Sequence, residues 1–185
     1  TKEGHLEQVD TSSFLTPGNK ILYEIYKDKD GKLWVSAFDV ESFIIDIRDY
    51  IVQKYPLPDL RNQLKANPAI NSLCKDEDGI FWFSQDRYGL CIYDSRKEKL
   101  KHYSQCQGTR NLPFGDVTNI ARSYNHNWIW ATSYGPTVFG LSQQNMEMKE
   151  EVRIELGNVT NNPGLITSLF EDPQNNLWIG TTTGL

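Results

Sequence analysis

Short runs in which apolar and polar residues alternate recur along this chain of 185 residues. Such runs open at Ile70, Val117 and Ile166, and each is followed by a polar turn rich in Asp, Asn, Ser or Gly. A second apolar run, carrying a tryptophan, comes next. Alternation with a period of two is typical of β-strands, and Asp, Asn and Gly tolerate the left-handed backbone of tight hairpins. The pattern therefore predicts a series of β-hairpins.

The hairpins belong to a longer repeat. Four tryptophans follow one another at a constant spacing of 48 residues, at Trp34, Trp82, Trp130 and Trp178. Residues 91–103 are typical of a strand, a charged turn and a second strand, and residues 43–55 and 137–156 occupy the same place in their units. One period thus holds four short strands, which we denote a, b, c and d. A period of about 40–50 residues with four strands and an aromatic signature predicts an all-β fold, a β-propeller built of four-stranded blades.

The repeated tryptophans are best interpreted as packing residues. A single four-stranded blade has two apolar faces and buries neither alone, whereas stacked blades cover both. A large flat side chain on strand b would fill the space between two blades. Trp128 lies two residues before Trp130 and therefore on the same face of its strand. It is either a second packing residue or one that reaches the rim of the blade.

The strand pattern also predicts how the blades divide the chain. We expect the end of a preceding blade over residues 1–17, full blades over 18–66, 67–114 and 115–162, and an incomplete blade over 163–185. This order leaves strands unmatched at both ends. Closure into four blades would leave a deficient seam, so the order favours part of a larger propeller of about seven blades. Open apolar blade faces would favour self-association, with a dimer as the expected form.

Composition excludes some kinds of partner. The net charge is −5 and the Lys and Arg residues are scattered, so no basic stripe for nucleic acid is present. No segment approaches the roughly 20 consecutive apolar residues of a spanning helix, so we expect no membrane contact within this segment.

The sequence contains no recognisable metal or cofactor motif. His5, His102 and His126 are isolated from one another. Cys74, Cys91 and Cys106 have spacings that match no zinc motif. We therefore expect no metal and no cofactor. The number of cysteines is odd, and each is interpreted as a small residue within a strand. Cysteine usage therefore does not decide between an oxidising and a reducing compartment.

The amino-acid sequence of the repeat resembles that of a known family. The segment ITSLFEDPQNNLWIGTTTGL is similar to the two-component regulator propeller repeat, through Leu177, Trp178, Ile179, Gly180, Thr181, Gly184 and Leu185. A second good match is INSLCKDEDGIFWFSQDRYGLCIYD, through Leu73, Asp76, Gly79, Trp82, Ser84, Gly89, Leu90 and Tyr93. The third unit departs most, because Asn125, His126 and Asn127 replace its Asp-x-x-Gly turn.

The resemblance implies a sensor. Proteins with this repeat are mostly hybrid two-component histidine kinase/response regulator proteins of polysaccharide-degrading bacteria. Their propellers form the periplasmic sensor domain of an inner-membrane protein and recognise oligosaccharides to regulate glycan utilisation. The resemblance thus implies no kinase chemistry in this segment and a periplasmic location. That location would permit a disulfide, for which Cys91 and Cys106 are the best candidates because strands c and d are neighbours.

Candidate ligand-binding residues lie in the b–c and d–a loops, where propellers commonly bind. They combine aromatic faces with polar groups suited to sugar hydroxyls or acid groups. The candidates are Asp86, Arg87, Tyr88, Tyr134, Arg110, Asn111 and Phe114, with Asp39, Asn161 and Asn162 in the same loops.

Two other functions remain open. A propeller glycosidase or lyase would need convergent carboxylates, and nothing in the sequence brings two acids together, so no catalytic residue is assigned. The DxDG turns only faintly resemble the S-x-D-x-G-x-x-W box of sialidases, because Asp30 and Asp78 adjoin the glycine. A protein-interaction scaffold is the third possibility, and it is compatible with sensing.

Overall fold

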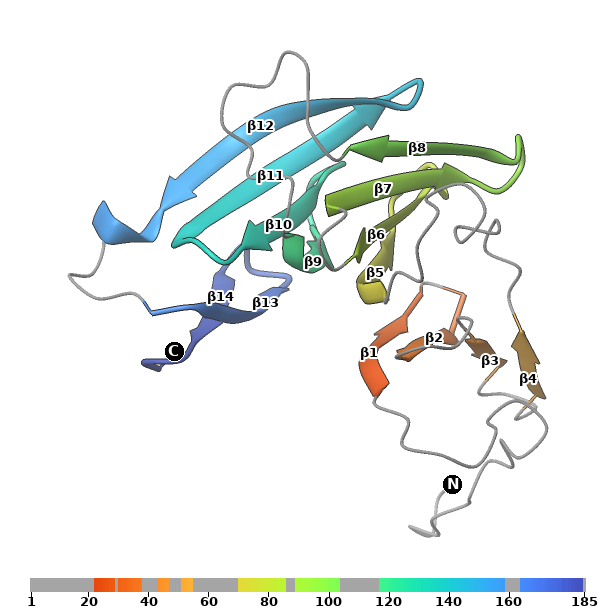
Figure 1. Cartoon of the computed structure of the whole chain (residues 1–185), viewed down its shortest axis with the longest axis horizontal. Helices are drawn as coiled ribbons and strands as arrows, with labels where there is room; N and C mark the ends of the chain where they lie inside the picture. The colour runs from red at the N-terminus through yellow and green to blue at the C-terminus, as the bar shows by residue number, and fades with distance from the viewer. Residues whose placement is uncertain are drawn as a thin grey trace, which may run out of the picture.

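The computed structural model describes residues 22–28, 30–37, 43–46, 51–54, 70–85, 89–103, 117–158 and 164–184. Within these ranges the strands form four antiparallel sheets that follow one another around a common centre (Figure 1). Each sheet is built from strands consecutive in the sequence, so each is one blade. The prediction of an all-β propeller with four-stranded blades is confirmed.

The strands of the first two blades have the following bounds. Blade 1 contains β1 (Leu22–Lys27), β2 (Lys32–Ala37), β3 (Phe43–Asp46) and β4 (Ile51–Lys54). Blade 2 contains β5 (Ile70–Lys75), β6 (Phe81–Gln85), β7 (Gly89–Asp94) and β8 (Lys99–Tyr103).

The remaining strands form blade 3 and a hairpin. Blade 3 contains β9 (Val117–Arg122), β10 (Ile129–Ser133), β11 (Thr137–Gln144) and β12 (Glu147–Glu155). A short 3-10 turn, η1 (Leu156–Asn158), follows it. The hairpin, which we call blade 4, contains β13 (Ile166–Glu171) and β14 (Leu177–Thr181). The predicted strand before blade 1 lies outside the described residues, and the predicted blade boundaries stay predictions.

The a–b turns form because an aspartate organises the backbone. In blade 1 the Asp28 Oδ1 atom accepts hydrogen bonds from the backbone N–H groups of Asp30 and Lys32, at 3.0 and 2.9 Å. In blade 4 the Asp172 Oδ1 atom does the same for residues 174 and 176. The turns also need a residue with positive φ, which Gly31 (φ 82°) supplies in blade 1 and Asn175 (φ 67°) in blade 4. The Asp-rich turn signature of the sequence is therefore a backbone requirement.

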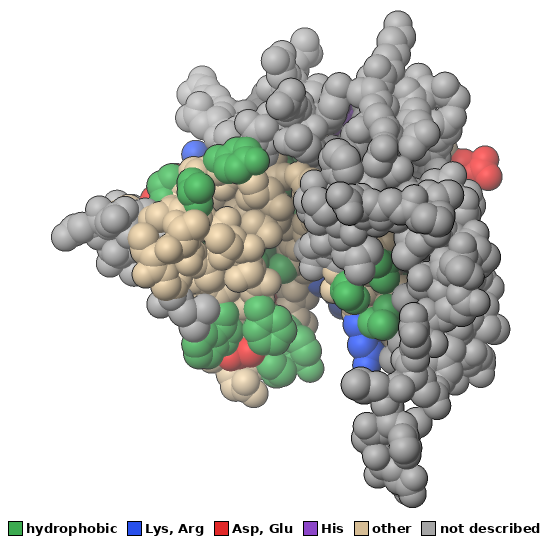
Figure 2. Space-filling view, turned by 60° about the horizontal axis from the view of Figure 1, so that its bottom comes forward, with side chains coloured by type: hydrophobic (Ala, Val, Ile, Leu, Met, Phe, Trp, Pro, Cys, Tyr) green, Lys and Arg blue, Asp and Glu red, His purple; other side chains and the backbone are tan. Residues whose placement is uncertain are grey.

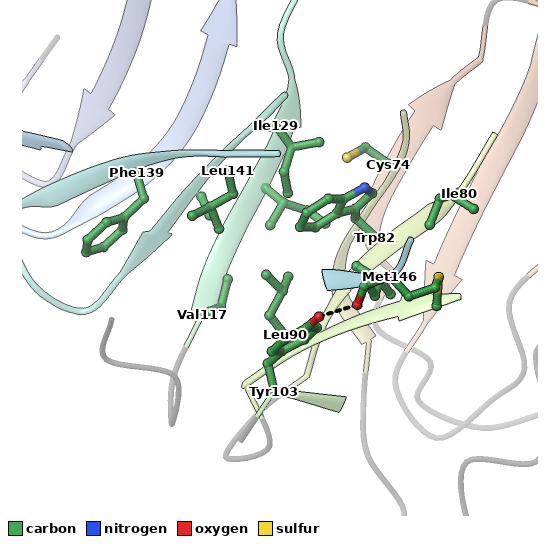
Figure 3. Close-up of a cluster of buried hydrophobic side chains, with 13 residues drawn as sticks. Cys74, Ile80, Trp82, Leu90, Tyr103, Val117, Ile129, Phe139, Leu141 and Met146 are labelled. Atoms are coloured by element: carbon green, nitrogen blue, oxygen red, sulfur yellow. Dashed lines mark hydrogen bonds between the residues drawn. The ribbon is translucent and has the colours of Figure 1, made fainter. Parts of the chain in front are cut away.

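The core lies between blades, and Trp34, Trp82 and Trp130 occupy it. Trp34 packs against strands of blade 2, with its ring centroid 4.6 Å from that of Phe81. Trp82 lies among residues of blades 2 and 3, including Ile129 (Figure 3). Trp130 packs with Ile166 of blade 4. The b strands of blades 1, 2 and 3 thus turn their tryptophans toward the following blade.

The first strand of each blade lies nearest the centre, and we call β1, β5, β9 and β13 the inner strands (Figure 1). Side chains bond them to one another. The Ser72 hydroxyl contacts both the N–H and the carbonyl oxygen of Ile120, each at 3.1 Å. Asn119 Nδ2 donates to the carbonyl oxygen of Ile166 at 3.5 Å. These contacts give hydrogen-bond partners to backbone groups of Ile120 and Ile166 on the inner strands.

Trp178 differs from its three counterparts in exposure. It is 47% exposed, whereas Trp82 is 1% exposed. Its cross-strand neighbour Phe170 is 61% exposed. Within the described ranges no sheet packs on this face of blade 4, which accounts for the difference. The described residues also contain no helix with the length and hydrophobicity to span a bilayer.

Trp82→Ala and Trp178→Ala form a matched pair, because both indoles make the same bond to an aspartate and differ in burial. We expect Trp82→Ala to lower the free energy of unfolding by about 3–5 kcal/mol, since it opens a cavity between blades. Trp178→Ala should cost less than about 1 kcal/mol. Urea denaturation measures both, and equal losses would contradict burial between blades as the source of the stability.

Candidate functional site

A groove of about 760 Å³ opens at the a–b turn end of the inner strands. Figure 2 shows hydrophobic side chains on both sides of a notch on this face, with basic side chains within it. All four blades contribute to the lining, which comprises Ile25, Tyr26, Lys27, Asp28, Leu73, Ile120, Ala121, Arg122, Ser123, Tyr124, Leu169, Phe170 and Glu171. The volume lies within the range of small-molecule sites, about 300–1,000 Å³.

The first groove carboxylate, Asp28, is occupied by structural hydrogen bonds. Its Oδ1 atom holds the a–b turn of blade 1, as described above. Its Oδ2 atom accepts the indole N–H of Trp34 at 2.8 Å. Asp76 and Asp172 make the same indole bond in blades 2 and 4, at 2.8 and 2.9 Å. The aspartate therefore joins the a–b turn to the packing tryptophan.

The second groove carboxylate, Glu171, replaces this aspartate in blade 3. Ser123 stands at the aspartate position there and accepts the N–H of His126 in a longer turn. The indole N–H of Trp130 instead donates to Glu171 Oε2 of blade 4, at 2.5 Å. Burial acts to raise the pKa of Glu171, which is 5% exposed. Hydrogen bonds from Trp130, Ser123 and the backbone of Tyr124 outweigh that effect, and the pKa lies below its ordinary value.

Arg122 brings three blades together at the floor of the groove. Its guanidinium forms an ion pair with Glu77 in the a–b turn of blade 2, and its charge partly offsets the effect of burial on the pKa of Tyr26 in blade 1. Its Nε–H is buried and has no hydrogen-bond partner in the described part of the chain. Burial raises the pKa of Tyr26 to about 12, so its hydroxyl stays neutral and can donate to the carbonyl oxygen of Lys75, at 3.4 Å.

Exposed apolar and aromatic side chains form the rim of the groove. Tyr124 and Phe170 are each 61% exposed on the side of blades 3 and 4. Ile25 is exposed on the side of blade 1, next to the exposed Lys27. Large exposed hydrophobic side chains that lie together commonly mark a binding surface.

The structure places the predicted site residues only in part. Tyr134 is 58% exposed in the b–c turn after β10, at the opposite end of that strand from Tyr124. It does not line the groove. The other predicted residues lie outside the described residues: Asp86, Arg87, Tyr88, Arg110, Asn111 and Phe114, with Asp39, Asn161 and Asn162. Cys106 does too, so the expected disulfide with Cys91 stays a prediction.

The groove residues were missed because no single repeat contains them. One signal was available: the last residue of each inner strand is Lys27, Lys75, Arg122 or Glu171. The acid at the fourth position breaks a series of bases.

The structure also settles the role of Trp128. Its ring lies edge-on to that of Trp130 at 5.8 Å and stacks on His126 at 4.1 Å. Trp128 is therefore a second packing residue.

Residues 162–183 match the model of the two-component regulator propeller repeat. Among curated protein sequences none matches the chain. Similar solved structures include two extracellular domains assigned to hybrid two-component systems of B. thetaiotaomicron. One has a TM-score of 0.60 at 20% identity over 93% of this chain and 22% of its own. The other has a TM-score of 0.57 at 23% identity over 87% of this chain and 20% of its own.

An enzyme is also among the similar structures. Virginiamycin B lyase from Staphylococcus aureus has a TM-score of 0.59 at 20% identity, over 92% of this chain and 56% of its own. The chain therefore spans about a fifth of the two-component domains and about half of the lyase. At these identities the likeness establishes the propeller fold alone.

Glu171→Gln tests the bond between blades 3 and 4. Because the pKa of Glu171 is lowered on folding, its carboxylate stabilises the protein above its ordinary pKa, and this contribution is lost as the pH falls through the lowered value. We expect the variant to lose about 1.5–3 kcal/mol of unfolding free energy at pH 7 and to differ less from the unsubstituted protein toward pH 3.

Glu150→Gln is the matched control for this variant. It removes a surface ion pair with Arg153 and should cost less than about 1 kcal/mol. Urea denaturation across the pH range measures both variants. A loss for Glu171→Gln that is no larger than the control's, or that does not change with pH, would contradict the assigned bond.

Proposed function

We propose that this chain belongs to an extracytoplasmic, periplasmic sensor propeller that binds an oligosaccharide and signals through a two-component system. The observation that carries the proposal is the match of residues 162–183 to the two-component regulator propeller repeat. The likeness to extracellular domains of hybrid two-component systems supports the same role. The histidine kinase of such a system would lie outside this chain, and glycan utilisation would be the regulated response.

The state of the groove carboxylates favours binding over catalysis. Glycoside hydrolysis needs two carboxyl groups, one free to donate a proton and one to attack or to activate water. Asp28 is committed to a turn and to Trp34, and Glu171 is committed to Trp130 and Ser123. Using Asp28 for chemistry would free the turn and the Trp34 indole of blade 1, and using Glu171 would break the bond between blades 3 and 4. The groove is therefore better suited to hold a ligand than to cleave one.

A propeller lyase is the second candidate, because one of the similar structures has that activity. A sensor releases its oligosaccharide unchanged, whereas a lyase cleaves it. The direct experiment is calorimetric titration of the purified protein with neutral and acidic oligosaccharides, followed by chromatography of the recovered sugar. We expect saturable binding and an unchanged oligosaccharide. Turnover of a glycan would contradict the sensor proposal, and binding only to another protein would favour a scaffold.

A further inference from the structure

We infer that the ligand of this protein binds in the inner-strand groove at the a–b turns, and that this ligand is an uncharged oligosaccharide. Tyr124 and Phe170 would carry the sugar rings, and Arg122 and Lys27 would donate hydrogen bonds to their oxygens. The inference rests on the proposed function, because it locates and specifies the site of the proposed sensor. It differs from the sequence-based expectation, which placed the site among the b–c and d–a loops.

The aromatic rim suits the apolar faces of sugar rings. Tyr124 and Phe170 come from the blade 3 turn and the blade 4 inner strand, and both line the groove. Each keeps 61% of its surface exposed. A planar aromatic ring offers a large contact area at a small cost in side-chain entropy. The hydrocarbon face of a pyranose can therefore lie on these rings while its hydroxyl groups point toward the polar floor.

The hydrogen-bonding capacity left open in the groove is on the donor side. The oxygens of Asp28 and Glu171 already accept bonds from indole and backbone N–H groups. The Arg122 guanidinium and the exposed Lys27 amine line the groove and supply N–H donors. An incoming ligand that offers hydrogen-bond acceptors can pair with them. Hydroxyl and ring oxygens of a saccharide are such acceptors.

The charge balance of the groove favours an uncharged ligand. Its basic groups, Lys27 and Arg122, are matched by the carboxylates of Asp28 and Glu171. Glu77 adds a further negative charge beside Arg122. An acidic sugar would gain little net attraction here, and it would lie near carboxylates that the Trp34 and Trp130 hydrogen bonds hold in place. A neutral saccharide meets no such penalty.

Two tyrosines that flank β10 allow the location to be tested directly. Tyr124 precedes the strand and lines the groove, and Tyr134 follows the strand at its other end. Their exposures, 61% and 58%, are nearly equal, so replacing either with Ala should leave the fold intact. The binding of each variant is measured by calorimetry with cellotetraose, mannotetraose and xylotetraose as neutral probes and tetragalacturonate as the acidic probe. Circular dichroism melting checks that each variant folds.

We expect one or more neutral probes to bind the unsubstituted chain and Tyr124→Ala to weaken that binding about tenfold or more. Tyr134→Ala should leave it within about twofold. Arg122→Gln should weaken it as well; if that variant melts early, Lys27→Gln replaces it, since the Lys27 side chain is exposed. Preferential binding of tetragalacturonate would overturn the choice of an uncharged ligand.

Weakening by Tyr134→Ala with no effect of Tyr124→Ala would overturn the location and leave the sensor proposal standing. Failure of all four probes to bind the unsubstituted chain would contradict the proposed function itself, and the groove assignment with it. The two failures are therefore distinguishable.

Discussion

The hydrogen bond from a tryptophan indole N–H to a carboxylate at an a–b turn is the interaction on which the blade stack depends. In blades 1, 2 and 4 one aspartate side chain accepts the indole proton with one oxygen and organises the hairpin with the other. The bond fixes the orientation of the large ring that the next blade must cover. The same aspartate thus holds both a local turn and the tryptophan that packs against the next blade.

Blade 3 shows what happens when the local carboxylate is absent. Trp130 keeps its indole bond, but the acceptor is Glu171 of the following blade. Ser123 and the Tyr124 backbone help to hold the pKa of the same glutamate low, and the inner strand of blade 4 lies against blade 3. Arg122 makes a comparable link from blade 3 back to Glu77 of blade 2. The groove lies over this row of contacts, so a ligand there would touch residues that hold neighbouring blades together.

The sequence predicted the four-stranded blades because the evidence for them, the alternation of apolar and polar residues and the position of the tryptophan, lies within each repeat. Glu171 could not be found that way, because its partner Trp130 lies in a different repeat and the sequence shows only a missing aspartate. The groove was missed for a related reason: it forms where four inner strands end together, and each strand contributes only a few side chains. Tyr134 was correctly expected to be in an exposed b–c turn, but exposure alone does not place a residue in a binding site.

A double-mutant cycle on Trp130 and Glu171 tests the central interaction most directly. Trp130→Phe removes the indole donor, Glu171→Gln removes the charged acceptor, and the double variant separates their coupling from the cost of each change. Unfolding free energies at pH 7 should give a coupling of about 1.5–3 kcal/mol, the range for hydrogen bonds to charged groups. Losses that add to within about 0.5 kcal/mol would contradict the account, because they would mean that blade 4 is not held through this bond.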